Sequence, residues 1–358
     1  MSRLLCSLCL ALCFTASLHA ENAPKFAELK GHETPVLDAV FSPDGKKVTT
    51  AEAYRGDIKI WDADSGRQLR KLEGHSQFVS SICFSPDGMK IVTTSFDRST
   101  RVWDVESGKQ LHLLQQQNQQ MTPSLRAVFS PDGKTVAGSD GVAIKIWDVD
   151  SGKELQKLEG YTGRANYPIF SLDGKKIASI GDGETAKVWD VDTGNELITL
   201  HHPGINFATF LQEGKKFVTS GSNRITIIWE TESGKELQKM EGWLCAFSTD
   251  GKKIATGGGT DGDIQIWDVD SGKKLQEFEG GMVRFALLGT FSPDGKKIVT
   301  VRGNFNDSNA RIWDVDSGKE ILKLEGHTRD VNSAYFSPDG KKVITTSSDR
   351  TARIWALE

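Results

Sequence analysis

Tryptophan recurs along this chain at a nearly constant interval. Eight of the nine tryptophans are separated by 42, 44, 42, 40, 38, 46 and 42 residues, and six of the eight are followed by Asp. A repeat of about 20–50 residues indicates a fold built from stacked copies of one unit. The series comprises Trp61, Trp103, Trp147, Trp189, Trp229, Trp267, Trp313 and Trp355.

A second landmark, "FSPDGKK" or a variant of it, precedes each of these tryptophans. Eight landmarks of each kind account for the chain from about residue 26 onward, so no sequence is left for a linker or a second folded domain. The second landmark begins at Phe41, Phe84, Phe129, Phe170, Phe210, Phe247, Phe291 and Phe336.

Each unit carries four short strand signals, here named a to d. In the second unit they cover 79–84, 90–94, a stretch ending at Trp103, and 110–114. Turn residues separate them, as in Pro86-Asp87-Gly88, where Pro fixes φ and Gly tolerates a positive φ. Runs of β-branched and aromatic residues between such turns predict strands and hairpins.

"GH" before strand a, "FSPDG" between a and b, and "WD" at the end of strand c resemble the WD-repeat family, and the resemblance covers residues 26–358. It implies a β-propeller whose blades are four-stranded antiparallel sheets around a channel. A single blade cannot bury both of its faces, so blades must stack, and closing the stack protects the sheet edges. We therefore expect an all-β protein with one closed, eight-bladed propeller.

The last unit stops after Trp355 and lacks its strand d. The segment "FAELKGH" at 26–32 aligns with "ILKLEGH" at 321–327. We therefore expect residues 25–30 to supply the missing outer strand of the last blade and close the ring.

The N-terminus has the pattern of an export signal. Arg3 precedes an apolar run from Leu4 to Leu18 that is too short to span a bilayer, and Ala20 offers a small residue for cleavage. A buried N-terminal strand or an uncleaved anchor is the alternative. The interpretation gives a signal peptide at 1–20, a propeller at 21–358, and a periplasmic or secreted protein without membrane insertion.

Cys83 and Cys245 remain after removal of the signal peptide. We expect them on opposite sides of the ring, as buried thiols that cannot form a disulfide.

The resemblance also implies a structural tetrad in which a buried Trp donates to a hydroxyl and a His and an Asp complete the chain of hydrogen bonds. Units three to seven lack the "GH" histidine, and unit one has Arg55 where the Asp belongs. Two units carry the full set, which is His75, Thr93, Asp97 and Trp103, then His327, Thr345, Asp349 and Trp355.

Other motifs favour turns over cofactor sites. The 257–262 segment matches G-x-G-x-x-G, but a strand ending at Trp267 follows it, whereas phosphate binding needs a helix N-terminus. The "DVDSGK" runs, as at 148–153, lack the distal bidentate Glu of a calcium loop and fit c–d hairpins. His201 and His202 are neighbours that point apart on an extended chain. We expect no cofactor, metal or catalytic residues.

The a–b and c–d turns are near-copies of one another, whereas the d–a and b–c loops on the opposite face differ between units. Short d–a loops in units five and six predict a depression there, and the resemblance implies that partners touch the start of strand a. The alternative is a structural role, in which Phe78, Phe285 and Trp243 pack between blades. The predicted partner-binding residues are Phe78, Leu125, Arg164, Asn206, Trp243, Phe285 and Asp330.

These observations favour a monomeric, non-catalytic scaffold that binds a protein or peptide through the d–a and b–c loops. A formal net charge of −4 gives no reason to expect a nucleic-acid partner. An eight-bladed quinoprotein-like enzyme is one alternative, but such enzymes have a Trp three residues after the turn Lys, where this chain has Gln156 or Gln238. A glycan or small-molecule binder at the channel mouth is the other.

Overall fold

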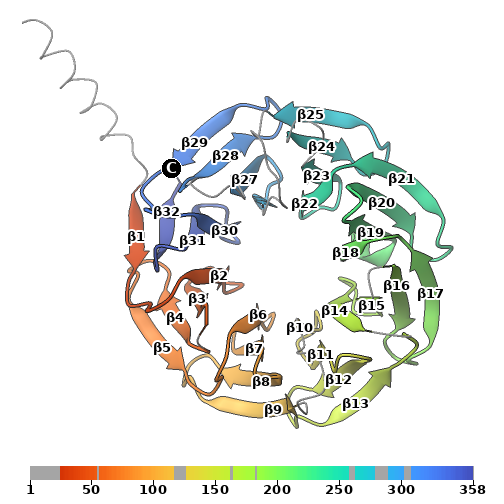
Figure 1. The fold of residues 1–358 in the computed structure, drawn as a ribbon, viewed down its shortest axis with the longest axis horizontal. Coiled ribbons are helices and arrows are strands. Elements are labelled where there is room, and N and C mark those ends of the chain that lie inside the picture. Colours follow the sequence, from red (N-terminus) through yellow and green to blue (C-terminus); the bar gives the residue numbers. More distant parts are fainter. Residues whose placement is uncertain are drawn as a thin grey trace, which may run out of the picture.

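The computed structural model describes residues 25–54, 56–116, 126–161, 164–181, 184–257, 263–278, 289–301 and 308–357. These ranges form eight four-stranded antiparallel sheets arranged as a closed ring (Figure 1). In each sheet the first strand lies nearest the centre and the fourth lies on the circumference. The expected eight-bladed propeller is therefore confirmed.

Blades one to four follow the chain in order. Blade one contains β2 (Val36–Phe41), β3 (Lys47–Glu52), β4 (Ile58–Asp62) and β5 (Gln68–Leu72). Blade two contains β6 (Val79–Phe84), β7 (Lys90–Ser95), β8 (Ser99–Asp104) and β9 (Gln110–Gln116). Blade three contains β10 (Ala127–Phe129), β11 (Thr135–Ser139), β12 (Ile144–Asp148) and β13 (Glu154–Leu158). Blade four contains β14 (Ala165–Phe170), β15 (Lys176–Gly181), β16 (Thr185–Asp190) and β17 (Glu196–His201).

Blades five to eight complete the ring. Blade five contains β18 (Ile205–Leu211), β19 (Lys216–Gly221), β20 (Ile225–Glu230) and β21 (Glu236–Glu241), with a 3₁₀ turn, η1 (Gln212–Gly214), after β18. Blade six contains β22 (Trp243–Phe247), β23 (Lys253–Gly257), β24 (Ile264–Asp268) and β25 (Lys274–Phe278). Blade seven contains β26 (Gly289–Phe291), β27 (Lys297–Val301), β28 (Ala310–Asp314) and β29 (Glu320–Leu324). Blade eight contains β30 (Val331–Phe336), β31 (Lys342–Ser347), β32 (Ala352–Ala356) and β1 (Phe26–Leu29).

The N-terminal strand closes the ring, as the sequence predicted. Strand β1 pairs antiparallel with β32, from Phe26 opposite Trp355 to Leu29 opposite Ala352. Leu29 is completely buried in a cluster that also contains Val36 of blade one. The two ends of the chain therefore complete one blade and seal it against the next.

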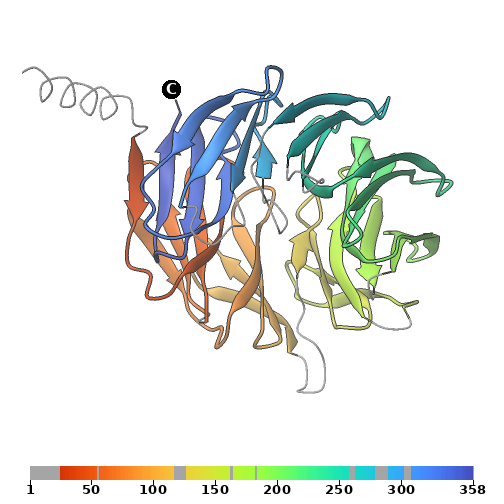
Figure 2. The same cartoon turned by 45° about the horizontal axis from the view of Figure 1, so that its top comes forward.

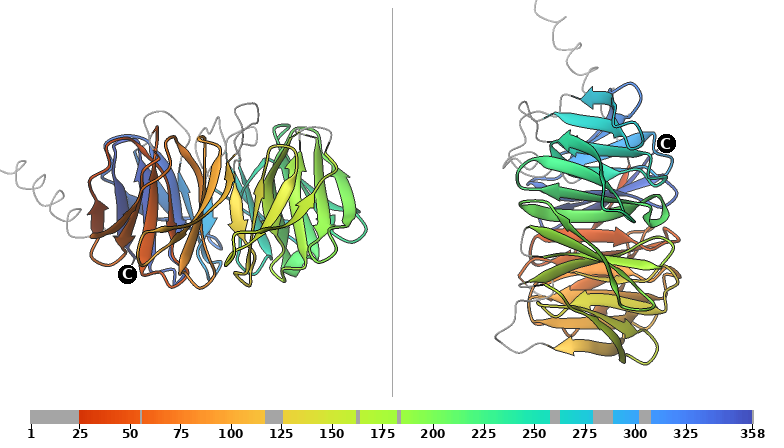
Figure 3. Two further views of the ribbon diagram at one scale, coloured as in Figure 1. Left: turned by 90° about the horizontal axis from the view of Figure 1, so that it is seen from below. Right: turned by 90° about the vertical axis from the view of Figure 1, so that its right-hand side faces the viewer.

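The hydrophobic core lies between blades rather than inside any one of them. One cluster joins Ile60 and Leu72 of blade one to Ile82, Ile91 and Trp103 of blade two. The blades stand side by side around the centre, and their strands cross the thickness of the disc (Figures 2 and 3). Stacking is what buries each sheet face, so the blades depend on their neighbours.

In the a–b and c–d turns, which carry the repeated sequence motifs, the polar side chains form hydrogen bonds within the turn itself. In blade one the Ser42 hydroxyl donates to Asp44, and Asp44 accepts the backbone N–H of Lys46. The c–d turns work likewise, since Asp148 accepts the N–H and hydroxyl of Ser151 ahead of Gly152 at φ 69°. We call the face that carries these a–b and c–d turns the turn face, and the opposite face, with the d–a and b–c connections, the loop face.

Two sequence expectations are settled by strand pairing or exposure. Strands β23 and β24 pair antiparallel with Gly257 opposite Ile264, so the glycine-rich segment connects two strands of a hairpin, although residues 258–262 lie outside the described residues. Cys83 and Cys245 are both free, and both residues are half-buried rather than fully buried as expected.

Candidate functional site

The tetrad residues of blade two form one hydrogen-bonded chain. The Trp103 indole donates to the Thr93 hydroxyl at 2.8 Å, and His75 Nε2 lies 2.7 Å from the same hydroxyl. His75 Nδ1 is 2.9 Å from Asp97, which also accepts the N–H of Ser76. The chain therefore ties the d–a loop to the b–c turn.

Blade eight repeats this geometry. His327 lies 2.8 Å from both Thr345 and Asp349, and Trp355 donates to Thr345 at 2.8 Å. Burial alone would raise the pKa of Asp349, but hydrogen bonds involving His327 and Thr351 outweigh it and hold that pKa well below its usual range. These side chains hydrogen-bond to one another within the blade.

Blade five contains a histidine network that the sequence analysis missed. His202 Nδ1 lies 2.7 Å from the Thr219 hydroxyl, to which Trp229 also donates, and Nε2 lies 3.3 Å from Asn223. The interpretation that units three to seven lack the histidine is therefore wrong for blade five. Its histidine does not follow a glycine, but Thr219 and Trp229 are ten residues apart, as Thr93 and Trp103 are.

Blade one holds its loop by an ion pair instead of an aspartate. Glu52 and Lys59 form a buried salt bridge, and Glu52 also accepts the N–H groups of Glu33 and Thr34. His32 keeps its contact with Thr50 at 2.9 Å. Burial, with the positive charge of Lys59, lowers the pKa of His32 to about 4. Arg55, which was assigned to the aspartate position, lies outside the described residues.

Blade four has a tyrosine in the histidine position. Tyr161 follows Gly160, as His75 follows Gly74, and its hydroxyl donates to the Ser179 carbonyl at 2.6 Å. The ring packs edge-on against Trp189 at 5.8 Å between centroids. Gly181 is required here, because a Cβ at this position would lie 2.2 Å from Tyr161 Cδ1. The "GY" dipeptide was the signal that could have revealed this substitution.

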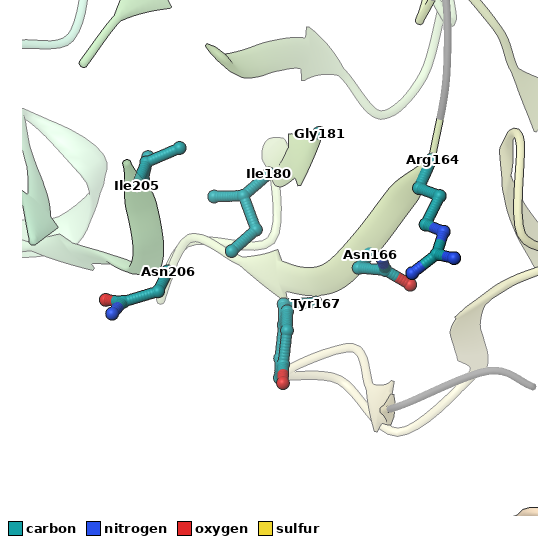
Figure 4. A pocket seen from close by; sticks show the side chains of 7 residues that line it. All are labelled: Arg164, Asn166, Tyr167, Ile180, Gly181, Ile205 and Asn206. Atoms are coloured by element: carbon teal, nitrogen blue, oxygen red, sulfur yellow. The ribbon is translucent and has the colours of Figure 1, made fainter. Parts of the chain in front are cut away.

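A pocket of about 470 Å³ opens beside this tyrosine, where blades four and five meet (Figure 4). Its walls come from the start of β14, the end of β15 and the start of β18. Two predicted partner-binding residues, Arg164 and Asn206, therefore line one cavity, from two blades. The lining residues are Arg164, Asn166, Tyr167, Ile180, Gly181, Ile205 and Asn206.

The pocket lies one blade earlier than the predicted depression beside units five and six. A tight turn at Gly204 (φ 74°) connects β17 to β18, and the first two residues of β18, Ile205 and Asn206, line the pocket. In blade six only Gly242 separates β21 from β22, so Trp243 is already a strand residue paired with Gly257. Trp243 is not among the pocket residues and lies under Arg224, whose guanidinium carbon is 5.0 Å from the indole centroid.

The other predicted partner-binding residues do not gather at this pocket. Phe78 is half-buried, and its ring lies 5.2 Å from that of Phe96 in the b–c connection of its own blade. Asp330 is half-buried in blade eight, where its carbonyl accepts the N–H of Ser348. Leu125 and Phe285 lie outside the described residues.

A second set of ionisable groups comes from the innermost strands of the ring. Asp38 of blade one accepts a hydrogen bond from Tyr335 of blade eight, and the charge of Arg126, just before β10 of blade three, acts on both. Burial raises the pKa of Asp38 to about 6, despite hydrogen bonds from Ala39 and Tyr335. Unlike Asp97 and Asp349, Asp38 has no histidine partner whose hydrogen bond would offset the effect of burial on its pKa.

The described part of the chain offers no metal centre and no membrane span. Within those ranges no three His, Cys, Asp or Glu side chains lie close enough to hold a metal ion. No helix among the described residues has the length and apolar character needed to cross a bilayer.

Comparison with known proteins identifies the repeat. The family model for the WD40 repeat, described as "WD domain, G-beta repeat", matches residues 24–62, 66–104, 243–268 and 318–356. The last match includes the full tetrad of blade eight, and the second includes that of blade two. A comparison with curated proteins found no match.

The fold also resembles solved structures. The crystal structure of the computationally designed Ika8 protein superposes with a TM-score of 0.78 over 92% of this chain and 98% of the designed one, at 23% sequence identity. At that identity the likeness concerns the fold alone. The four matched segments are therefore WD40 repeats, and the tetrads and the eight closed blades agree with a β-propeller built from such repeats.

Proposed function

We propose that this protein is a non-catalytic scaffold that binds a protein or peptide through its loop face, with the pocket between blades four and five as the anchor. WD40 propellers generally act as protein-interaction scaffolds and are usually not enzymes. The observation that carries the proposal is that pocket, because polar side chains from two blades meet there around a cavity.

The two faces of the disc differ in what their polar groups are free to do. On the turn face, Ser and Asp side chains bond within their own turns, as Ser171 and Asp173 do in blade four. On the loop face, Arg164 and Asn206 are exposed, and neither side chain has a partner among the described residues. Polar groups without internal partners can exchange a hydrogen bond to water for one to a ligand. The Ser and Asp side chains of the turns are already hydrogen-bonded within the protein and are less available to a ligand.

The test needs a partner and a matched pair of variants in one blade. Pull-down from the extracellular or periplasmic fraction would supply a candidate, and calorimetry would then compare Arg164→Met on the loop face with Lys175→Met on the turn face. We expect the first to weaken binding at least tenfold, about 1.4 kcal/mol, and the second to change it little. Melting curves for both variants exclude unfolding as the cause.

Trp243 needs the same measurement, because it is half-buried beside Arg224, and Trp and Arg are common interface anchors. Trp243→Ala should weaken binding if the partner extends from the pocket onto blade six. Greater losses from Lys46→Ala, Lys175→Ala and Lys341→Ala than from Arg164→Met and Trp243→Ala would place the binding site on the turn face and refute the proposal.

We also propose that residues 1–20 direct export and are removed near Ala20. Support comes from Arg3, the apolar run that follows it and the small residue at the cleavage position. N-terminal sequencing of the mature protein should begin near Glu21. Recovery of a cytosolic protein that still begins at Met1 would contradict this.

A further inference from the structure

We infer that the pocket between blades four and five recognises an acidic peptide segment, in which a carboxylate pairs with Arg164 and a neighbouring backbone N–H donates to Asn166. This inference rests on the proposed function and adds the chemistry of the ligand. Four features of the pocket carry it, and each concerns a different group.

The first feature is the positive charge. Arg164 is exposed at the start of β14 and forms no ion pair within the described residues. The carboxylate of Asp140, in the adjacent blade, is already engaged by the N–H groups of Val142 and Ala143 and by Lys145. A guanidinium binds a carboxylate through two parallel hydrogen bonds, so Arg164 favours an anionic ligand.

The second feature is a buried acceptor. Asn166 Oδ1 is shielded from solvent and has no hydrogen-bond partner within the described residues, although the backbone carbonyl of Asn166 accepts a hydrogen bond from the Ser179 hydroxyl. Figure 4 shows Asn166 and Arg164 both at the pocket, from the same end of β14. An unpaired buried oxygen is rare in native proteins, and a ligand N–H would satisfy it.

The third feature is a strained backbone. Tyr167 has a φ of 56°, a conformation that aromatic residues rarely adopt, and the β14–β15 register shifts between Asn166 and Ile169. Its hydroxyl has no partner among the described residues, and Figure 4 shows the ring at the pocket rim. Strain of this kind is concentrated at binding sites, where the local geometry is held by the surrounding fold.

The fourth feature is an apolar floor between the polar groups. Ile180 and Ile205 line the cavity, and Asn206 adds an exposed amide on the far side. A peptide fits this combination because it supplies N–H donors, carbonyl acceptors and an aliphatic stem together. A free phosphate ion supplies essentially only acceptors at neutral pH and would leave Asn166 Oδ1 unsatisfied, so a peptide is favoured over inorganic phosphate.

The experiment uses a phage-displayed library of random heptapeptides panned on the full mature chain. Parallel selections use Arg164→Met, which keeps the length of the side chain without its charge, and Lys175→Met as the turn-face control. We expect wild type and Lys175→Met to enrich peptides with Asp or Glu at a fixed position, and Arg164→Met to lose that enrichment.

The best peptide is then synthesised with its acidic residue and with the matching amide. The amide should bind wild type at least tenfold more weakly, and Arg164→Met should bind the two forms equally. Asn166→Leu should weaken both forms by a similar factor, because it removes the acceptor for the backbone N–H and not the charge. Equal binding of both forms by wild type would overturn the inference.

The outcomes separate the two proposals. Peptides that depend on Asn166 and Asn206 but show no acidic preference would leave the scaffold function standing and refute the acidic ligand. Peptides whose binding is unchanged in Arg164→Met, Asn166→Leu and Asn206→Ala would place the site elsewhere and refute both proposals for this pocket.

Discussion

Blades two and four have the same four strands and the same buried tryptophan, but their connections on the loop face are held in different ways. In blade two, His75 and Asp97 join the d–a loop to the b–c turn, and each side chain of this tetrad has a hydrogen-bond partner within it. In blade four, Tyr161 bonds only to the backbone of β15 and β16, and the pocket opens beside it. The comparison teaches that, among the described residues, the blade whose tetrad histidine is replaced by tyrosine is one that contributes polar side chains without partners to a cavity.

The largest expected effect tests whether a blade closed from the N-terminus is as firmly held as blade three, the neighbour of blades two and four, whose outer strand β13 is its own. Leu29 of β1 and Leu158 of β13 occupy equivalent positions and are 0% and 1% exposed. Leu29→Ala and Leu158→Ala should each lower the free energy of unfolding by about 2–5 kcal/mol in chemical denaturation. A loss of less than half as much for Leu29 would mean that β1 does not act as an ordinary fourth strand.

The next effect concerns the tetrad itself. Asp97→Ala leaves His75 and the Ser76 N–H without their acceptor, so we expect a loss of about 1–3 kcal/mol, with a similar loss for Asp349→Ala. Because the pKa of Asp97 is held below its usual range, its contribution is present above the unfolded pKa and is lost as the pH falls through the folded pKa. Melting curves between pH 3 and 8 would check both statements, and a pH-independent loss would contradict them.

Asp38 should behave in the opposite way, because it is desolvated without a histidine partner. Its pKa is raised from 3.8 to about 6, so deprotonation costs stability, and that cost develops between the two values and is constant above them. Asp38→Asn should therefore stabilise the fold by about 1–3 kcal/mol at pH 8 and have little effect at pH 3.5. If Asp38→Asn instead lowers the free energy of unfolding at pH 8, the interactions of the Asp38 carboxylate with Tyr335 and Arg126 outweigh the cost of its burial.

The tyrosine that replaces the histidine in blade four should matter less than the tetrad. Tyr161→Phe removes a hydroxyl that donates to the Ser179 carbonyl and accepts the Lys187 N–H, but it keeps the ring packed on Trp189. We expect a loss of about 0.5–1.5 kcal/mol. If Tyr161→Phe costs as much as Asp97→Ala in the same denaturation experiment, blades two and four are equally well fixed and the contrast between them fails.

The smallest effect on stability is expected inside the pocket. Asn166→Leu replaces an unsatisfied buried oxygen by an apolar group of similar size, so its free energy of unfolding should change by less than about 1 kcal/mol, in either direction. A larger destabilisation, with or without loss of binding, would show that Asn166 is part of the fold and not held available for a ligand.

Much of the architecture could be predicted from the sequence. The first strand of unit two was expected at 79–84, and the structure has β6 at the same residues. Such accuracy follows from local signals, because Pro-Asp-Gly and Ser-Gly turns fix where each strand begins. The histidine of blade five was missed, since His202 lies before Pro203 rather than after a glycine, and only its contact with Thr219 reveals its role.

The sequence by itself determined the number of blades, the strand order within each blade and the closure by β1. These depend on a repeat period, on turn residues close to the strands they connect, and on an alignment between the two ends of the chain. Only the tertiary structure decided which polar groups are left without partners. Asn166 and Asn206 belong to different blades, and whether they face one cavity depends on how the blades pack and how short the turn at Gly204 is. Two polar side chains form a hydrogen bond only if they lie close together in space. A repeat pattern carries no information about distances between side chains of neighbouring units.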